Sequence, residues 1–149
     1  MILPADQLIS LRGVVAMVDG GFDPIHPGHI TYFRAAAALG APVLCNISTD
    51  EWLAAKHPLL LRQHERAQII DAIRYIDYTH LSHGSTEDVL RELRPRFYVK
   101  GADWRGRLPG EQVEICAAHG IEVVYLETVT NSSTALLERY ERHRRDGSA

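Results

Sequence analysis

The sequence has few cysteines, little net charge and no long apolar segment. Its two cysteines, Cys45 and Cys116, match no metal-ligand spacing, so we expect buried thiols and neither a disulfide framework nor a zinc site. The formal net charge of −3 gives no electrostatic reason to expect a nucleic-acid partner. No apolar stretch reaches the ~20 residues that a membrane span needs, and the first residues do not resemble a secretion signal. These absences predict a cytoplasmic protein that binds neither nucleic acid nor membranes.

What the sequence does contain is typical of one folded domain. Hydrophobic residues make up 46% and charged residues 23% of the chain, which excludes wholesale disorder. A length of 149 residues suits a single hydrophobic core, and no internal repeat or low-complexity linker interrupts it. We therefore interpret residues 1–149 as one domain.

Short apolar runs alternate with amphipathic segments along the chain. Consecutive apolar residues predict strands buried on both faces at 14–18, 43–47, 78–81, 97–99 and 121–126. Near-helical spacing predicts helices at 27–39, 62–73, 86–93, 109–119 and 133–144, with a short one opening at 48–51. This alternation predicts an α/β fold, a Rossmann-like three-layer sandwich with a central parallel sheet of about five strands.

The most informative stretch is GGFDPIHPGHI, residues 20–30, which follows the first predicted strand. Its two opening glycines would let the backbone approach a ligand without a Cβ in the way. Pro27 suits the first turn of a helix, whose free N–H groups bind phosphates. His26 and His29 are three residues apart, so they share one face of that helix start and can point at one phosphoryl group. A structural turn or a metal-binding pair of histidines are the alternatives.

Other candidate ligand-binding segments also follow predicted strands. They are residues 48–50, 100–104 and 128–134, in addition to the glycine and histidine segment. In open parallel sheets, ligands bind outside the carboxyl ends of the strands. We therefore expect these segments to surround one site.

The pattern Gly-Phe-Asp-Pro-x-His-x-Gly-His, residues 21–29, resembles the signature of the nucleotidyltransferase superfamily whose members carry a His-x-Gly-His motif. Within it, the chain is most similar to glycerol-3-phosphate cytidylyltransferases, which carry segments like Ser48–Trp52, Ile73–Asp77 and Gly101–Trp104 in the same order. Asn131–Thr134 is similar to that family's Ile-Ser-Thr-Thr. The likeness covers residues 14–140, nearly the whole chain.

This resemblance implies that an acceptor phosphate oxygen attacks the α-phosphate of a nucleoside triphosphate and that pyrophosphate leaves. The donor is expected to be CTP and the acceptor a small phosphate or phosphonate. Mg²⁺ would arrive with the triphosphate, held mainly by phosphates and water, so we assign no residue as a metal ligand. Members of the family are usually homodimers, which we also expect here.

The resemblance also implies site residues. The expected catalytic residues are His26, His29, Lys56 and Arg74. The expected nucleotide-binding residues are Gly20, Gly21, Phe22, Gly28, Lys100, Gly101, Asp103, Trp104, Thr128, Ser132, Ser133 and Thr134.

Some of these residues also have purely structural interpretations. Lys56 suits a surface lysine beside a proline loop, and Arg74 suits a cap of helix carbonyls. Residues 132–134 suit a simple N-cap, and Trp104 suits core filling. We interpret Asp23 as fixing the turn and not as a base.

The chain departs from the cytidylyltransferase pattern in two places. Glu127 stands where those enzymes have an arginine, and Pro58 and Leu59 stand about where they have a second lysine. Either the acceptor differs, or the missing cations are replaced by Arg62, Arg105 or Arg107. An ATP-dependent adenylyltransferase for a sugar phosphate such as heptose 1-phosphate is a second interpretation, because such enzymes have a similar Val-Lys-Gly-x-Asp turn. A catalytically silent nucleotide-binding module is a third.

Overall fold

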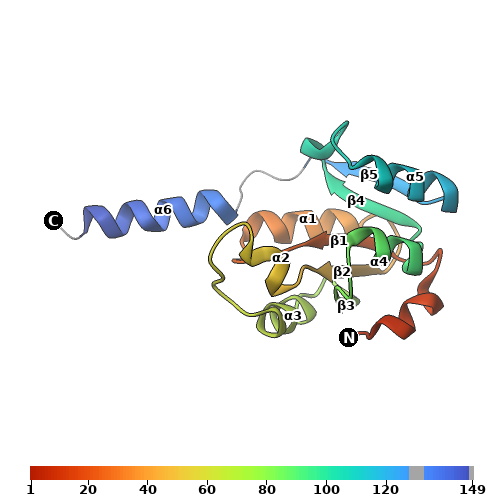
Figure 1. The fold of residues 1–149 in the computed structure, drawn as a ribbon, viewed down its shortest axis with the longest axis horizontal. Helices are drawn as coiled ribbons and strands as arrows, with labels where there is room; N and C mark the ends of the chain where they lie inside the picture. Colours follow the sequence, from red (N-terminus) through yellow and green to blue (C-terminus); the bar gives the residue numbers. More distant parts are fainter. Residues whose placement is uncertain (128–132, 148–149) are drawn as a thin grey trace.

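The computed structural model describes residues 1–127 and 133–147. In this part of the chain, five parallel strands form one sheet in the order β3-β2-β1-β4-β5 (Figure 1). The strands are Ala16–Gly20 (β1), Val43–Ile47 (β2), Tyr78–Leu81 (β3), Phe97–Gly101 (β4) and Glu122–Leu126 (β5). The predicted α/β fold with a parallel sheet is confirmed.

Helices connect the strands and cover both faces of the sheet. One face carries Pro27–Ala37 (α1) and Gln63–Asp71 (α3), and the other carries Thr86–Leu93 (α4) and Gly110–His119 (α5). Asp50–Ala54 (α2) is a short helix after β2, and Ser133–Asp146 (α6) extends outward from the body in Figure 1. The described residues also form two 3₁₀ helices, Ala5–Leu11 (η1) and Ala102–Trp104 (η2).

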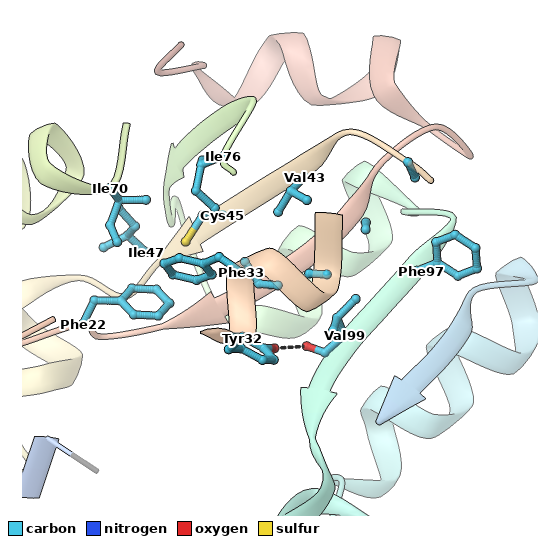
Figure 2. Packing of buried hydrophobic residues seen from close by; sticks show 14 of the residues in the cluster. Phe22, Tyr32, Phe33, Val43, Cys45, Ile47, Ile70, Ile76, Phe97 and Val99 are labelled. Carbon is cyan, nitrogen blue, oxygen red and sulfur yellow. Dashed lines mark hydrogen bonds between the residues drawn. The ribbon is translucent and has the colours of Figure 1, made fainter. Parts of the chain in front are cut away.

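The sheet separates two layers of buried side chains. Figure 2 shows the layer beneath α1, where Phe22 and Phe33 pack against strand residues such as Cys45 and Ile47. The Tyr32 hydroxyl donates to the Val99 carbonyl at 2.5 Å, which ties α1 to β4. Residues of α4, α5 and η1 form the second layer on the opposite face. Both layers are apolar because each strand contributes side chains to both faces of the sheet.

Most predicted boundaries agree with the structure. The strands at 43–47 and 78–81 and the helix at 86–93 match β2, β3 and α4. β1 begins two residues later than predicted and continues to Gly20, because the Gly20 carbonyl still accepts a hydrogen bond from the Ser48 amide at 2.9 Å. η1 was not predicted, since its seven residues lack a clear apolar period and are held by one fully buried side chain, Leu8.

The strand order reverses at β1. The chain passes from β1 to β2 and β3 on one side of the sheet, then returns to place β4 beside β1 on the other. Such a reversal leaves a crevice outside the carboxyl ends of the two central strands, where ligands of open α/β sheets bind. Within the described ranges, no helix has the length and apolar character to cross a bilayer.

Candidate functional site

The segment between β1 and α1 is held by close packing around its two glycines. A Cβ on Gly21 would lie 2.7 Å from Cδ1 of Leu53 in α2, and one on Gly20 would lie 3.0 Å from the Phe22 ring. Neither glycine has a positive φ, whereas Phe22 has a φ of 53°. The expectation that these glycines leave room for a ligand is therefore corrected, because protein side chains fill that space. Ligand contacts by their backbone groups stay a prediction.

His26 and His29 cap the start of α1 together. Nδ1 of His26 accepts a hydrogen bond from the Gly28 amide at 3.1 Å, and Nδ1 of His29 accepts one from the His26 amide at 3.2 Å. The two rings stack with centroids 3.8 Å apart and planes 25° apart. A neutral imidazole carries one proton, so a ring whose Nδ1 accepts must carry that proton on Nε2. Each ring is therefore fixed as an Nε2–H donor.

Burial keeps both rings neutral near pH 7. It lowers the pKa of His26, and together with the neighbouring His26 ring it lowers the pKa of His29 to about 4. Nε2 of His26 is buried and has no hydrogen-bond partner among the described residues. A buried donor without a partner is costly in a folded protein, so its presence favours a site that a ligand completes.

Two lysines lie at the same edge of the sheet. Lys100, in β4, forms an ion pair with Asp19 at 3.0 Å, and its Nζ lies 4.3 Å from the centroid of the Trp104 ring. Lys56 follows α2 and places Nζ 3.7 Å from the centroid of the Trp52 ring. The pKa of Lys56 is lowered, mainly by burial and further by the positive charge of Lys100, while the negative charge of Asp19 opposes this shift. The charges of these three side chains therefore interact. Sequence reasoning named both lysines and missed Asp19. It named Trp52 within the Ser48–Trp52 segment but did not assign it to the site.

Asp23 holds the loop after Lys56 against the motif. Its side chain is buried, and its two carboxylate oxygens accept hydrogen bonds from the amides of Leu60 and Leu61 at 2.9 and 3.0 Å. This geometry agrees with a role in fixing the turn. It also positions the segment that carries Lys56.

Arg66 in α3 is a buried connector that sequence reasoning missed. Its Nη1 donates to the carbonyls of Gly21 and Ser48 at 2.8 and 2.9 Å, and its Nη2 pairs with Asp50 at 2.8 Å. The side chain is completely buried. It links the motif, the end of β2 and the start of α2, which are the segments around the crevice. No sequence signal points to this role, because an arginine in a helix usually faces solvent.

Arg74 does not join the histidines within one chain. It is exposed and lies between the end of α3 and the start of β3, at the amino ends of the strands. The histidines lie at the carboxyl ends, on the opposite edge of the sheet. The catalytic assignment of Arg74 is therefore not supported by the geometry of a single chain.

The remaining predicted residues fall into three groups. Gly28 is buried in the first turn of α1, and Gly101, Asp103 and Trp104 lie at the end of β4 and in η2, beside Lys100. Thr134 is exposed on the first turn of α6. Thr128, Ser132 and the side chain of Ser133 lie outside the described residues.

Glu127 occupies the position of the missing family arginine and faces a different arginine. It pairs with Arg105 at 3.7 Å, and both side chains are exposed. The Arg105 guanidinium also lies 5.2 Å from the centroid of the Tyr125 ring. Arg105 thus contacts Glu127 and Tyr125 at the surface, and its replacement of the missing cation stays a prediction.

No group of three or more His, Cys, Asp or Glu in the described ranges could hold a metal ion. A magnesium ion held by triphosphate oxygens and water would need few protein ligands.

Known proteins match most of this chain. The D-beta-D-heptose 1-phosphate adenylyltransferase of Bordetella bronchiseptica is 32% identical over 83% of this chain and 79% of its own length. The glycerol-3-phosphate cytidylyltransferase of Staphylococcus aureus is 29% identical over 80% of this chain and 89% of its own. The bifunctional protein HldE of Gluconobacter oxydans is 32% identical over 84% of this chain, which spans only 27% of HldE.

A solved structure and a family model also match this chain. The lipopolysaccharide core biosynthesis protein of Thermoplasma volcanium has the same fold, with a TM-score of 0.66 over 78% of this chain and 98% of its own, at 19% identity. The model of the family described as cytidylyltransferase-like matches residues 17–139. The chain belongs to this cytidylyltransferase-like family.

Proposed function

We propose that this protein is a nucleotidyltransferase that transfers a nucleoside monophosphate from a triphosphate, CTP in the leading interpretation, to a small phosphate or phosphonate acceptor. The observation that carries the proposal is the stacked pair of neutral imidazoles, each with its Nδ1 engaged at the helix start. Two fixed Nε2–H donors beside a helix N-terminus suit a phosphoryl group on which negative charge develops.

In the proposed reaction an acceptor phosphate oxygen forms a new bond to the α-phosphorus. The bond between that phosphorus and the bridging oxygen of the β-phosphate breaks, and pyrophosphate leaves with the electron pair. The acceptor oxygen is already ionised, so no general base is required. His26 and His29 donate hydrogen bonds to the α-phosphoryl oxygens and need not give up their protons, which agrees with their lowered pKa values.

The lysines supply the remaining positive charge. Lys56 is exposed at the crevice and free to contact phosphate, with the Trp52 ring beneath its ammonium group. Lys100 is nearly buried and already neutralised by Asp19. Lys56 is therefore assigned to phosphate binding, and Lys100 to the floor of the crevice. Mg²⁺ bound by the triphosphate would supply further positive charge.

The choice between CTP and ATP rests on the relatives. The cytidylyltransferase of S. aureus aligns along most of its length and supports CTP with a glycerol phosphate acceptor. The adenylyltransferase of B. bronchiseptica, at 32% identity, supports ATP with a heptose 1-phosphate. We keep the second as the alternative, since Lys100 and Gly101 resemble the turn of the sugar-phosphate enzymes. A homodimer and a cytoplasmic location are part of the proposal.

Pyrophosphate release tests the proposal directly. The purified protein is incubated with Mg²⁺ and CTP, then with ATP, over a panel of acceptors that includes glycerol 3-phosphate, heptose 1-phosphate and a phosphonate. Release that requires both a triphosphate and an acceptor supports the proposal, and the preferred triphosphate decides between the two interpretations. Nucleotide binding without pyrophosphate release would favour the silent module and overturn the transferase.

A further inference from the structure

Polar side chains form a short row across the sheet, on the face covered by α4 and α5. Asp19 in β1 and Asn46 in β2 are register partners, and Lys100 of β4 reaches Asp19 from the other side. Because side chains alternate along a strand, the row shares its face with residues two positions earlier. Those residues belong to the layer packed under α4 and α5, and they are Met17, Leu44 and Tyr98.

Two acceptor oxygens of this polar row lack good hydrogen-bond donors. Asn46 is 2% exposed, and its Oδ1 is buried with no partner among the described residues. Oδ2 of Asp19 receives only long contacts, 3.4 Å each, from the hydroxyls of Thr86 and Tyr98. Hydroxyl donors normally approach to about 2.8 Å, and a carboxylate can accept about four hydrogen bonds. Oδ1 of Asn46 and Oδ2 of Asp19 therefore have unused capacity to accept, and a group that contacts these oxygens must donate.

The row is also electrically neutral as a whole. Lys100 and Asp19 are 11% and 12% exposed and compensate each other's charge at 3.0 Å. A second anionic group of a ligand would gain little attraction here and would face the Asp19 carboxylate. An uncharged group with hydroxyls suits the row, because each hydroxyl donates one hydrogen bond and also accepts from a donor such as Lys100.

We propose that Asn46, Asp19 and Lys100 form a subsite for an uncharged, hydroxyl-bearing part of the acceptor, and that Asp19 is its specificity-determining residue. This inference rests on the proposed transferase function. His26, His29 and Lys56 bind phosphoryl groups. The polar row binds the part of the acceptor that carries no phosphate, and so determines which acceptor is used. The site then favours a polyol or sugar phosphate over a phosphate ester of similar size with an apolar body.

Matched phosphate esters test the subsite. Glycerol 3-phosphate and propyl phosphate differ by two hydroxyls, and mannose 1-phosphate and cyclohexyl phosphate provide a larger pair. Asn46→Leu removes the buried carbonyl and keeps the branched shape and the number of side-chain heavy atoms. The double variant Asp19→Asn with Lys100→Gln removes both charges together. Wild type should prefer the hydroxylated member of a pair by at least 10-fold in kcat/KM, and each variant should reduce that preference about 10-fold.

The stability of the variants separates binding from folding. Asn46→Leu should keep or raise the Tm, because it removes an unpartnered buried oxygen, and yet lose selectivity. Asp6→Asn in η1 changes an exposed carboxylate and serves as the control with unchanged selectivity. A preference that is absent in wild type, or unchanged in both folded variants, would overturn the inference.

A separate readout covers a protein that releases no pyrophosphate with any acceptor. That result overturns the transferase, while ligand-induced shifts of Tm with the same paired esters still measure the subsite. A larger shift with the hydroxylated ester in wild type, lost in Asn46→Leu, would support the subsite alone. Equal shifts with both esters would overturn it.

Discussion

Replacing His29 by asparagine separates the two roles of its imidazole. Nδ1 accepts a hydrogen bond from the His26 amide at 3.2 Å, so Nε2–H is the donor left for the proposed ligand. An asparagine Oδ1 can take the place of Nδ1, but the side chain has no atom at the place of Nε2–H. We expect His29→Asn to fold normally and to lose about 100- to 1000-fold in turnover, the usual cost of removing one donor to a developing charge.

Alanine and glutamine at position 29 complete the comparison. His29→Ala loses the capping bond as well as the donor, so it should lose the same turnover and about 1 kcal/mol of stability. For a chain of 149 residues that stability loss lowers Tm by roughly 2–4 °C. The longer glutamine side chain can place an amide N–H near the position of Nε2–H. His29→Gln should therefore retain more activity than His29→Asn and less stability.

Steady-state pyrophosphate release and thermal unfolding by circular dichroism measure the two effects. His119→Asn in the last turn of α5 changes an exposed histidine and should alter neither. If His29→Asn kept more than a tenth of wild-type turnover, the Nε2–H donor would have no place in the mechanism. If it were as unstable as His29→Ala, the capping role of Nδ1 would be refuted.

Three further predictions concern stability. The pKa of His29 is lowered to about 4 in the fold from 6.5, so its contribution should be complete above pH 6.5 and be lost as the pH falls toward 4. Urea unfolding at pH 7 and pH 4.5 should show a loss of about 2 kcal/mol from this residue, absent in His29→Asn. Gly21→Ala should lower the free energy of unfolding by about 1–3 kcal/mol, because its Cβ clashes with Leu53. Leu53→Val in the same chain should recover part of that loss in thermal unfolding. If the losses of the two single variants simply added in the double variant, the packing argument would be contradicted. Arg66→Met should lower the free energy of unfolding in urea by about 3–5 kcal/mol, because it leaves the buried partners of Arg66 unpaired. Arg34→Met, at an exposed position, should lower it by less than about 0.5 kcal/mol. Equal effects of the two substitutions would contradict the connecting role of Arg66.

The parts of the fold that were predictable are those that local sequence determines. Continuous apolar runs indicated the central strands, and the boundaries of β2 and β3 agree with them. The Ser85 hydroxyl accepts a hydrogen bond from the Asp88 amide, so this N-cap serine allowed the helix that begins at Thr86 to be predicted. The histidines were predictable as a pair because residues three apart at a helix start share a face.

The parts that were not predictable depend on contacts between distant segments. Asp19 and Lys100 are 81 residues apart and meet only because β1 and β4 are neighbours in the sheet. Arg66 contacts the carbonyl of Gly21, 45 residues away in sequence, because the packing of α3 against the sheet places it beside that segment. Arg74 was assigned from a sequence segment, but a segment match does not tell which edge of the sheet the residue occupies.

The geometry of the helix start explains why histidine suits both motif positions. Each side chain accepts from a backbone amide through Nδ1 and, in the proposed reaction, donates to the ligand through Nε2–H. A lysine donates but cannot accept, and an asparagine accepts but does not reach as far. Neutral imidazole joins one acceptor and one donor on a rigid ring, so capping the helix also aims the donor. Burial makes the arrangement reliable at neutral pH, because it keeps the second proton off the rings and so preserves both capping bonds.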